Sequence, residues 1–537
     1  MAEFCRRGPR WEAEHMSAGL LRTYLAAVLV GALALGGCVG RELRAVSDDA
    51  RRDAGTGTVH PVVSAPDDAT LIVTGTAADL ATATSRALYD EAPVVVLAAA
   101  GEPGAQAWAG SVAVRLGVPL LLTPSAGSPS ADRSAAAVAD ELTRLGARFL
   151  LTFESLSTQW AQDLSGDREV LAAPADPAEL AALTRTEFGE VRTPEPLSAV
   201  TVLATGHERE LAAVATSRAA GARVLEVPGG DPRAHGEVIA ALAGQPPAAV
   251  VALGDSFGTP AQLRRRLEVA ATGVQLPGGG QLVVPGRLMV ALYGHPGTPS
   301  LGVLGEQRLP AAIARARQVA GEYEELTELP VVPAFEIITS VASSAAGPDG
   351  DYSAEAEAED LRPWIDAAGE AGLYVMLDLQ PGRTDFLTQA KAYTELLAEP
   401  HVGLALDPEW RLKPGQQHLA QVGSVSAAEV NSVISWLAEL TAKRALPQKL
   451  LILHQFRLSM VGDRDRVDTH RDEVAVLVHA DGNGTPDLKL ETWRALTGPL
   501  PPGMWLGWKN FYDEDSPTFS PEQTLAVEPT PLFISYQ

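Results

Sequence analysis

The sequence contains almost no cysteine. Only two of its 537 residues are Cys, at positions 5 and 38. If Cys5 is removed with a leader segment, neither a disulfide nor a cysteine-based zinc site can form in what remains. A chain of this length buries enough apolar surface to fold without covalent cross-links.

Basic residues are also scarce. Lys and Arg total 42 against 67 Asp and Glu, which gives a formal net charge of −25. Residues 1–37 carry four Arg and three Glu, so their removal leaves a net charge of about −26. Such an acidic surface argues against nucleic acid as a partner and against docking onto anionic lipids. Any membrane attachment is therefore expected to come from a lipid anchor.

No apolar run is long enough to span a bilayer comfortably. The longest near the N-terminus is Leu25–Leu35, preceded by Arg6, Arg7, Arg10 and Arg22, which is typical of a signal peptide. It ends in Leu35-Gly36-Gly37-Cys38, which resembles a bacterial lipobox. The resemblance implies cleavage before Cys38 and a diacylglycerol on its thiol. An ordinary secretory signal with an incidental Cys38 is the alternative, and translation starts at Met1 or Met16.

The predicted domain order follows from composition and periodicity. Residues 1–37 form the signal peptide and 38–68 a polar tether that holds the protein on the extracytoplasmic face of the cell membrane. Residues 69–285 alternate apolar strands with helical stretches and predict a parallel α/β domain of one or two layered units. Its expected strands are Thr70–Val73, Val94–Leu97, Val118–Thr123, Phe149–Phe153, Val200–Leu203, Ala222–Val227 and Ala248–Leu253.

Part of this domain resembles a type 2 cell wall-binding repeat. The resemblance lies in Pro93–Leu97, the stretch around Ala107–Ala113, Gly117–Thr123, and Leu145-Gly146-Ala147 followed by Phe149–Thr152. The sequence departs from the family pattern at Ala105–Ala109, where an Asp-Ala-Leu-Ser-Ala-like segment is usual. The family implies a small α/β unit that attaches to wall polymers; a purely structural α/β module is the alternative.

Residues 286–537 predict a (β/α)8 barrel of the TIM type. Eight apolar runs alternate with longer polar or helical segments, over a length close to the ~250 residues of such barrels. The runs are Arg287–Tyr293, Val331–Ile338, Leu373–Leu379, Val402–Leu406, Leu450–Phe456, Val474–His479, Met504–Trp508 and Pro531–Tyr536. Capping-box patterns open two of the expected helices, at Ser426 and Ser520. No helix is expected after the last run.

Three stretches of the barrel resemble a C-terminal domain found beside such repeats in Gram-positive lipoproteins. They are Ala405–Trp410, His454–Arg457 and Trp508–Asp515. The resemblance implies an architecture and a surface location, and it does not indicate which activity the domain has.

Acidic side chains lie at the ends of the predicted strands, where barrel enzymes build their active sites. The candidate catalytic residues are Glu336, Asp378, Asp407, Glu409 and Asp481. Glycosidases use two carboxyl groups, roughly 5–5.5 Å apart for retention and 6.5–9.5 Å for inversion. We expect Glu409 as the acid, or Glu336 if Glu409 points outward, with Asp407 or Asp481 as base or nucleophile. The structural alternative is that Asp407 caps a turn and Glu409 pairs with Arg411.

Aromatic and polar residues at the same strand ends predict a sugar-binding cleft, although the chain is only 5% aromatic. The candidate substrate-binding residues are Tyr293, His295, His454, Gln455, Trp508 and Lys509. The alternative is that loops use these rings as hydrophobic plugs over the barrel mouth.

Other chemistries have weaker patterns. His295, His454 and His479 could gather with Asp378 and Asp481 around a metal, but no metal-binding spacing is present, so no metal or other cofactor is expected. Gly254-Asp255-Ser256-Phe257-Gly258 matches a nucleophile elbow and leaves a serine esterase at Ser256 as a minor alternative.

The sequence thus predicts a surface-anchored lipoprotein whose barrel binds, and as a possible glycoside hydrolase cleaves, an envelope glycan such as cell wall polysaccharide. A noncatalytic wall-binding or solute-binding lipoprotein is the alternative.

Overall fold

The computed structural model describes residues 58–123, 131–153, 164, 166–174, 177–183, 190–498 and 500–537. The predicted signal peptide, Cys38 and most of the predicted tether lie outside these residues. Within them, no helix combines the length and the apolar character needed to cross a bilayer. Two short strands, β1 (Thr58–Val59) and β2 (Val62–Val63), pair with β9 (Glu190–Val191) and β4 (Tyr89–Glu91). Regular structure therefore begins before Thr70, within the stretch expected as a tether.

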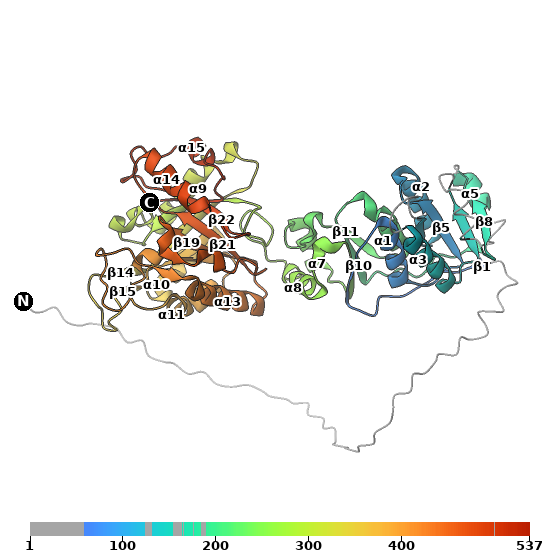
Figure 1. Ribbon diagram of the computed structural model, residues 1–537, viewed down its shortest axis with the longest axis horizontal. Coiled ribbons are helices and arrows are strands. Elements are labelled where there is room, and N and C mark those ends of the chain that lie inside the picture. The colour runs from blue at the N-terminus through green and yellow to red at the C-terminus, as the bar shows by residue number, and fades with distance from the viewer. Residues whose placement is uncertain are drawn as a thin grey trace, which may run out of the picture. The chain divides into compact units, whose positions relative to one another are not determined.

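The N-terminal part contains two four-stranded parallel sheets, which confirms the predicted parallel α/β architecture (Figure 1). The first has the order β6-β5-β7-β8 and consists of β5 (Val94–Ala99), β6 (Leu120–Thr123), β7 (Phe149–Thr152) and β8 (Glu169–Ala172). The second has the order β11-β10-β12-β3 and consists of β3 (Thr70–Val73), β10 (Val200–Ala204), β11 (Arg223–Glu226) and β12 (Ala249–Leu253).

Helices pack against both of these sheets. They are α1 (Ala77–Leu88), α2 (Pro103–Leu116), α3 (Ala131–Arg144), α5 (Pro177–Leu183), α6 (Leu211–Ala219), α7 (Gly236–Gly244) and α8 (Pro260–Ala270). One buried cluster includes Val95 and Leu97 of the first sheet together with Val202 and Val251 of the second. The two sheets are thus packed as layers of one folded region.

The C-terminal part is a closed barrel of eight parallel strands, as predicted. The strands are β13 (Leu288–Gly294), β14 (Val331–Ala342), β16 (Tyr374–Leu379), β17 (Val402–Leu406), β19 (Lys449–Gln455), β21 (Val474–Ala480), β22 (Trp505–Asn510) and β23 (Phe533–Tyr536). Each strand pairs with the next in this order, and β13 also pairs with β23, which closes the sheet. A short antiparallel strand, β15 (Ser353–Glu355), adds to the end of β14.

Helices surround the barrel (Figure 1). They are α9 (Leu309–Gly321), α10 (Ala358–Glu370), α11 (Phe386–Ala392), α12 (Thr394–Leu397), α13 (Ala427–Lys443), α14 (Pro486–Thr497) and α15 (Pro521–Leu525). A full capping box forms at Ser520, whereas at Ser426 the side chain accepts from the Glu429 amide but Glu429 turns away to Arg411. Between β19 and β21 the described chain has 3-10 turns and the two-residue strand β20 (Val461–Gly462) in place of an α-helix.

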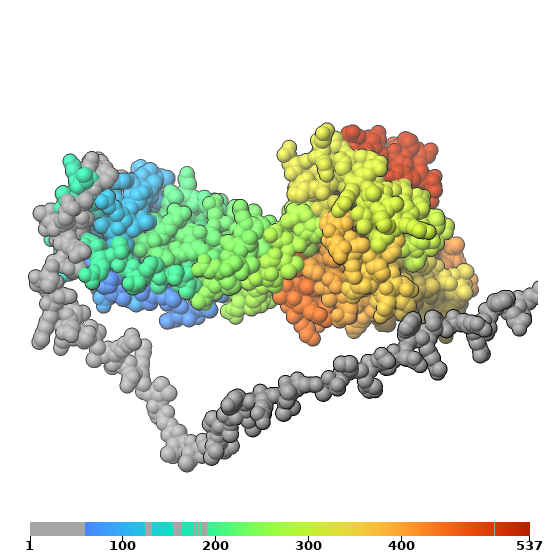
Figure 2. Space-filling view, turned by 180° about the vertical axis from the view of Figure 1, so that it is seen from behind, coloured from blue at the N-terminus to red at the C-terminus, as the bar shows by residue number. Residues whose placement is uncertain are grey.

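Strand alternation divides the barrel residues into an inner and an outer core. The inner core includes Met289, Ala334, Met376 and Ile452, while alternate residues such as Leu292 pack against the helices. In the space-filling view the last residues (red) border residues near the start of the barrel (yellow-green), as the β13–β23 pairing requires (Figure 2). The inward positions nearest the C-terminal ends of the strands are polar.

Candidate active site

Every barrel strand contributes a polar side chain to one cluster at the C-terminal end of the barrel. The members are Tyr293 (β13), Glu336 (β14), Asp378 (β16), Asp407 (after β17), His454 (β19), His479 and Asp481 (on and just after β21), Lys509 (β22) and Ser535 (β23). All are buried. Burial of so many polar groups is costly unless they are paired, so their contacts define the site.

His454 is the centre of this cluster. Its Nε2 lies 2.9 Å from Glu336 Oε1 and its Nδ1 lies 3.0 Å from Asp481 Oδ2. Asp378 Oδ1 is 3.8 Å from the same Nε2. Burial alone would lower the pKa of His454, but the charges of Glu336 and Asp378 and the hydrogen bonds to Asp481 and Glu336 raise that pKa well above its usual value. The ring is therefore an imidazolium that donates from both nitrogens.

A second chain of contacts leads from the cluster to the surface of the cleft. Lys509 Nζ lies 3.2 Å from Asp481 Oδ1 and 3.5 Å from the centre of the Tyr293 ring. Tyr293 in turn donates its hydroxyl to Asp378 Oδ2 at 2.9 Å and accepts from Gln380 Nε2 at 3.3 Å. Lys509 thus balances the charge of Asp481, and Tyr293 orients Asp378.

The carboxyl groups of the cluster differ in pKa. Burial would raise the pKa of Asp481, but Lys509 and the hydrogen bond from His454 lower it below its usual value. Burial also opposes ionisation of Glu336, yet the charge and hydrogen bond of His454 lower its pKa. These two groups are ionised at neutral pH.

Three other carboxyl groups have raised pKa values. Burial, together with the charge of Asp481, raises the pKa of Glu409 to about 7. Burial raises the pKa of Asp378 to about 6, and burial with the nearby Asp378 and Asp481 raises that of Asp407 well above its usual value. Neighbouring carboxyl groups with opposed pKa shifts are typical of sites that need one acid and one base.

A cleft of about 810 Å³ opens above the cluster. This volume lies within the ~300–1,000 Å³ typical of ligand pockets. Five acidic side chains line it: Asp407, Glu409 and Asp481 next to the cluster, and Glu491 and Glu514 farther along the chain. Its other lining residues include Tyr293, Trp410, Phe456, Arg457, Asn483, Lys509 and Phe511. Aromatic faces and polar groups thus share one cleft with acid–base residues.

The structure brings most of the predicted site residues together. The five carboxyl groups, His454 and Tyr293 belong to the cluster or line the cleft, as does Lys509. Asp407 does cap the turn at 408–410, as the structural alternative supposed, because its Oδ1 accepts from the Glu409 amide at 3.1 Å. Arg411, however, pairs with Glu429 and leaves Glu409 without an ion-pair partner among the described residues.

Three predicted site residues lie elsewhere. Trp508 is buried on the outer face of β22, with its ring 5.5 Å from that of Trp493 on α14. Gln455 also faces outward and accepts from Arg464. His295 lines a neighbouring hollow with Trp364 and lies beside the Ile338 carbonyl oxygen. Strand alternation explains the outward direction of Trp508 and Gln455, because their neighbours Lys509 and His454 point inward.

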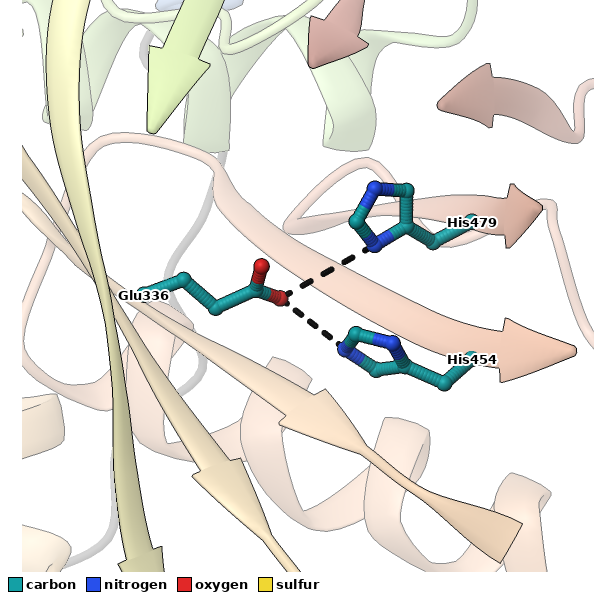
Figure 3. Close-up of side chains that lie close together, drawn as sticks. All are labelled: Glu336, His454 and His479. Atoms are coloured by element: carbon teal, nitrogen blue, oxygen red, sulfur yellow. Dashed lines mark hydrogen bonds and ion pairs between the residues drawn. The ribbon is translucent and has the colours of Figure 1, made fainter. Parts of the chain in front are cut away.

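Three residues of the site were absent from the predicted catalytic and substrate-binding residues: Ser535, Gln380, and His479, which had been considered only as a metal ligand. The alternation pattern contains the signal for His479, because it is two residues before Asp481 and so shares its face. Figure 3 shows Glu336 pointing from β14 toward His454 and His479, which are register partners on β19 and β21. One ligand atom from each of these three residues lies within 4.8 Å of the others, a spacing that could hold a metal ion.

The nucleophile-elbow sequence forms a 3-10 turn, Asp255–Phe257, after β12. Ser256 is exposed there, and among the described residues no histidine forms a hydrogen bond with its hydroxyl.

His479 belongs to the barrel cluster and differs from His454 in charge. Burial lowers the pKa of His479 to about 4, so its ring is neutral.

A scan against protein-family models and a search of curated proteins both find no match to this chain. The resemblance to cell wall-binding repeats thus stays a prediction, and any assignment of function has to come from the geometry of the barrel site.

Proposed function

We propose that the barrel is a glycoside hydrolase that cleaves an envelope glycan, in a protein held at the membrane by a lipid on Cys38. One observation carries the proposal. Glu409, without a basic partner, and Asp481, ion-paired to Lys509, open into the same cleft at the C-terminal end of the barrel. Two carboxyl groups in such different environments are what acid–base cleavage of a glycosidic bond needs.

The roles follow from the contacts. Glu409 is the proton donor to the leaving sugar oxygen, because burial and the charge of Asp481 favour its protonated form. Asp481 is the base or nucleophile, since its ion pair with Lys509 keeps it charged at the cleft surface. Asp407 lies beside them. Its Oδ1 accepts a hydrogen bond from the backbone amide of Glu409 and so positions Glu409.

The aromatic lining supports a sugar as ligand. Trp410, Phe456 and Phe511 line the cleft, and flat rings of this kind stack on the apolar faces of pyranose rings. Arg457 and Asn483 supply hydrogen-bond donors for hydroxyl groups.

A noncatalytic binding protein would hold its cleft carboxylates in ion pairs with neighbouring arginines. Among the described residues, these arginines form no ion pair with Asp407, Glu409 or Asp481: Arg411 pairs with Glu429, Arg383 lies over the Tyr352 ring, and Arg457, although it lines the cleft, lies over the Phe456 ring. This arrangement favours hydrolysis over binding alone. We further propose that the α/β domain attaches the enzyme to wall polymers, on the strength of its sequence resemblance.

The test is hydrolysis of purified cell wall glycans by the mature protein. Glu409→Gln and Asp481→Asn should each lower turnover by ~10²-fold or more, at the lower edge of the ~10²–10⁴-fold general acid contribution. Glu439→Gln is the matched control, because Glu439 is exposed on α13. Full activity of both cleft variants on a glycan that the unmodified protein cleaves would refute the proposal.

A further inference from the structure

Three buried atoms of the cluster have no hydrogen-bond partner. They are Glu336 Oε2, Asp378 Oδ1 and His479 Nδ1. All three residues are fully buried. A buried polar atom without a partner costs ~1–3 kcal/mol, so three in one cluster call for an explanation. They belong to side chains that surround the Nε2 atom of His454.

The spacing of the surrounding atoms matches a small metal ion. Glu336 Oε1 is 2.9 Å from His454 Nε2 and 4.0 Å from His479 Nδ1. Asp378 Oδ1 is 3.8 Å from His454 Nε2. Ligands at ~2.0–2.2 Å from a tetrahedral Zn²⁺ lie roughly 3.3 Å from one another. The observed separations fall on both sides of that value. Glu336, His454 and His479 each place one ligand atom within 4.8 Å of the other two, and Asp378 adjoins this group through His454.

Three of the four side chains around this space, those of Asp378, His454 and His479, are also held by a contact to the polar atom that faces away from it. His454 Nδ1 faces Asp481, His479 Nε2 lies 3.3 Å from Ser535 Oγ, and Asp378 Oδ2 accepts from Tyr293. Bonds of this kind fix the tautomer and direction of metal ligands, and the carboxylate–histidine pair is the commonest of them. His479 Nδ1 therefore faces the cluster without a hydrogen-bond partner, and His454 Nε2 would exchange its hydrogen bond with Glu336 for a bond to the cation.

We propose that Glu336, Asp378, His454 and His479 bind one divalent transition-metal ion, with Zn²⁺ as the best match. Two imidazoles and two carboxylates suit Zn²⁺, Mn²⁺ or Fe²⁺ better than Mg²⁺ or Ca²⁺, which prefer oxygen ligands alone. On binding, the ion replaces the proton on His454 Nε2, which is released, and supplies a partner to Asp378 Oδ1 and His479 Nδ1. Glu336 Oε2 gains a partner when that carboxylate binds the ion through both oxygens. Three of these ligands, His454, His479 and Asp378, had been considered as a metal set from the sequence and set aside because they follow no short metal-binding spacing; the four ligands come from four different strands.

The ion would lie beneath the floor of the cleft. Its ligands are buried, whereas Asp481, which holds His454, lines the cleft. The metal would fix His454 and, through it, Asp481. The inference concerns binding alone and stands whether or not the cleft hydrolyses a glycan.

Calorimetry on the mature, tag-free protein, stripped with a chelator, tests the inference with Zn²⁺ as the probe. We expect one equivalent to bind and the melting temperature to rise. His479→Gln and Glu336→Gln should each weaken binding by more than ~100-fold, beyond the ~10–100-fold cost of losing an outer-shell partner. His295→Gln is the matched control, because His295 lies outside the cluster, and it should bind as tightly as the unmodified protein.

Ser535→Ala provides a second variant that keeps every ligand. It removes only the hydroxyl beside His479 Nε2 and should weaken Zn²⁺ binding by ~10-fold or more. If a ligand variant fails to fold, this substitution decides the question. Absence of binding to the unmodified protein at millimolar Zn²⁺, or equal affinity in His479→Gln and Ser535→Ala, would overturn the proposal.

Discussion

Glu409 is expected to lower the stability of the barrel at neutral and alkaline pH. Burial and the charge of Asp481 raise its pKa from 4.5 to about 7, so the folded protein opposes its ionisation. Between these two values the unfolded chain has lost the proton and the folded protein still holds it. Stability therefore falls as pH rises from about 4.5 to about 7 and stays reduced above that.

The magnitude follows from the shift. A rise from 4.5 to about 7 corresponds to about 3 kcal/mol, at ~1.4 kcal/mol for each pKa unit. Glu409 lines an open cleft, so solvent screening reduces the effect to ~1–2 kcal/mol. The charged groups that face it are Asp481, Lys509, His454 and Arg457, of which only Asp481 opposes its ionisation.

Glu409→Gln removes the titrating group and keeps its shape. At pH 8 we expect this variant to be more stable than the unmodified protein by ~1–2 kcal/mol, while at pH 4 the difference should vanish. Urea unfolding followed by tryptophan fluorescence measures both, because six of the nine Trp residues lie within the barrel. Glu439→Gln, on an exposed position, should change stability by less than ~0.5 kcal/mol at either pH. A loss of stability at pH 8, or a gain that grows on acidification, would refute the reasoning.

Four further outcomes are expected. Glycan hydrolysis should decline as pH rises through about 7, the pKa of Glu409, and a pH–rate profile will show this. Lys509→Met should destabilise the barrel by ~3 kcal/mol in urea titrations, because it leaves the buried Asp481 with His454 as its remaining partner; the exposed Lys413→Met is the control. Trp493→Ala should cost ~3–5 kcal/mol by the same assay, since Trp493 is only 2% exposed. Cys38→Ser should shift the protein from the membrane fraction to the medium, and an uncleaved variant that stays with the membrane would indicate a transmembrane anchor instead.

The barrel could be predicted from sequence because each strand is a short apolar run between polar segments. Parallel strands buried on both faces need such runs, and all eight predicted runs coincide with strands of the barrel. The order of pairing then follows from the rule that successive βα units are neighbours. In the α/β domain the same logic found seven of the eight strands of the two described four-stranded sheets and missed β8 (Glu169–Ala172). It also did not predict that Thr70–Val73 joins β12 in the second sheet. That pairing depends on a contact between segments far apart in the chain.

The site was only partly predictable. Asp378, Asp407 and Asp481 were found because carboxyl groups are conspicuous at the ends of apolar runs. Trp508 and Gln455 were assigned wrongly, although each neighbours an inward residue and must therefore face outward. The contacts around His454 could not be predicted, because the distance between side chains on different strands depends on the register of the closed sheet.

The pairing of β13 with β23 has a consequence for the timing of folding. Met289 lies beside Phe533, so the two strands that close the barrel are separated by nearly the whole domain. A ribosome has to complete the last strand before the sheet can close, and contacts of such high sequence separation form slowly. Until then Glu336, His454 and their partners would be open to water. We therefore expect the polar cluster to assemble late, after synthesis of the last strand, and the nascent protein to be most at risk of aggregation while the sheet is still open.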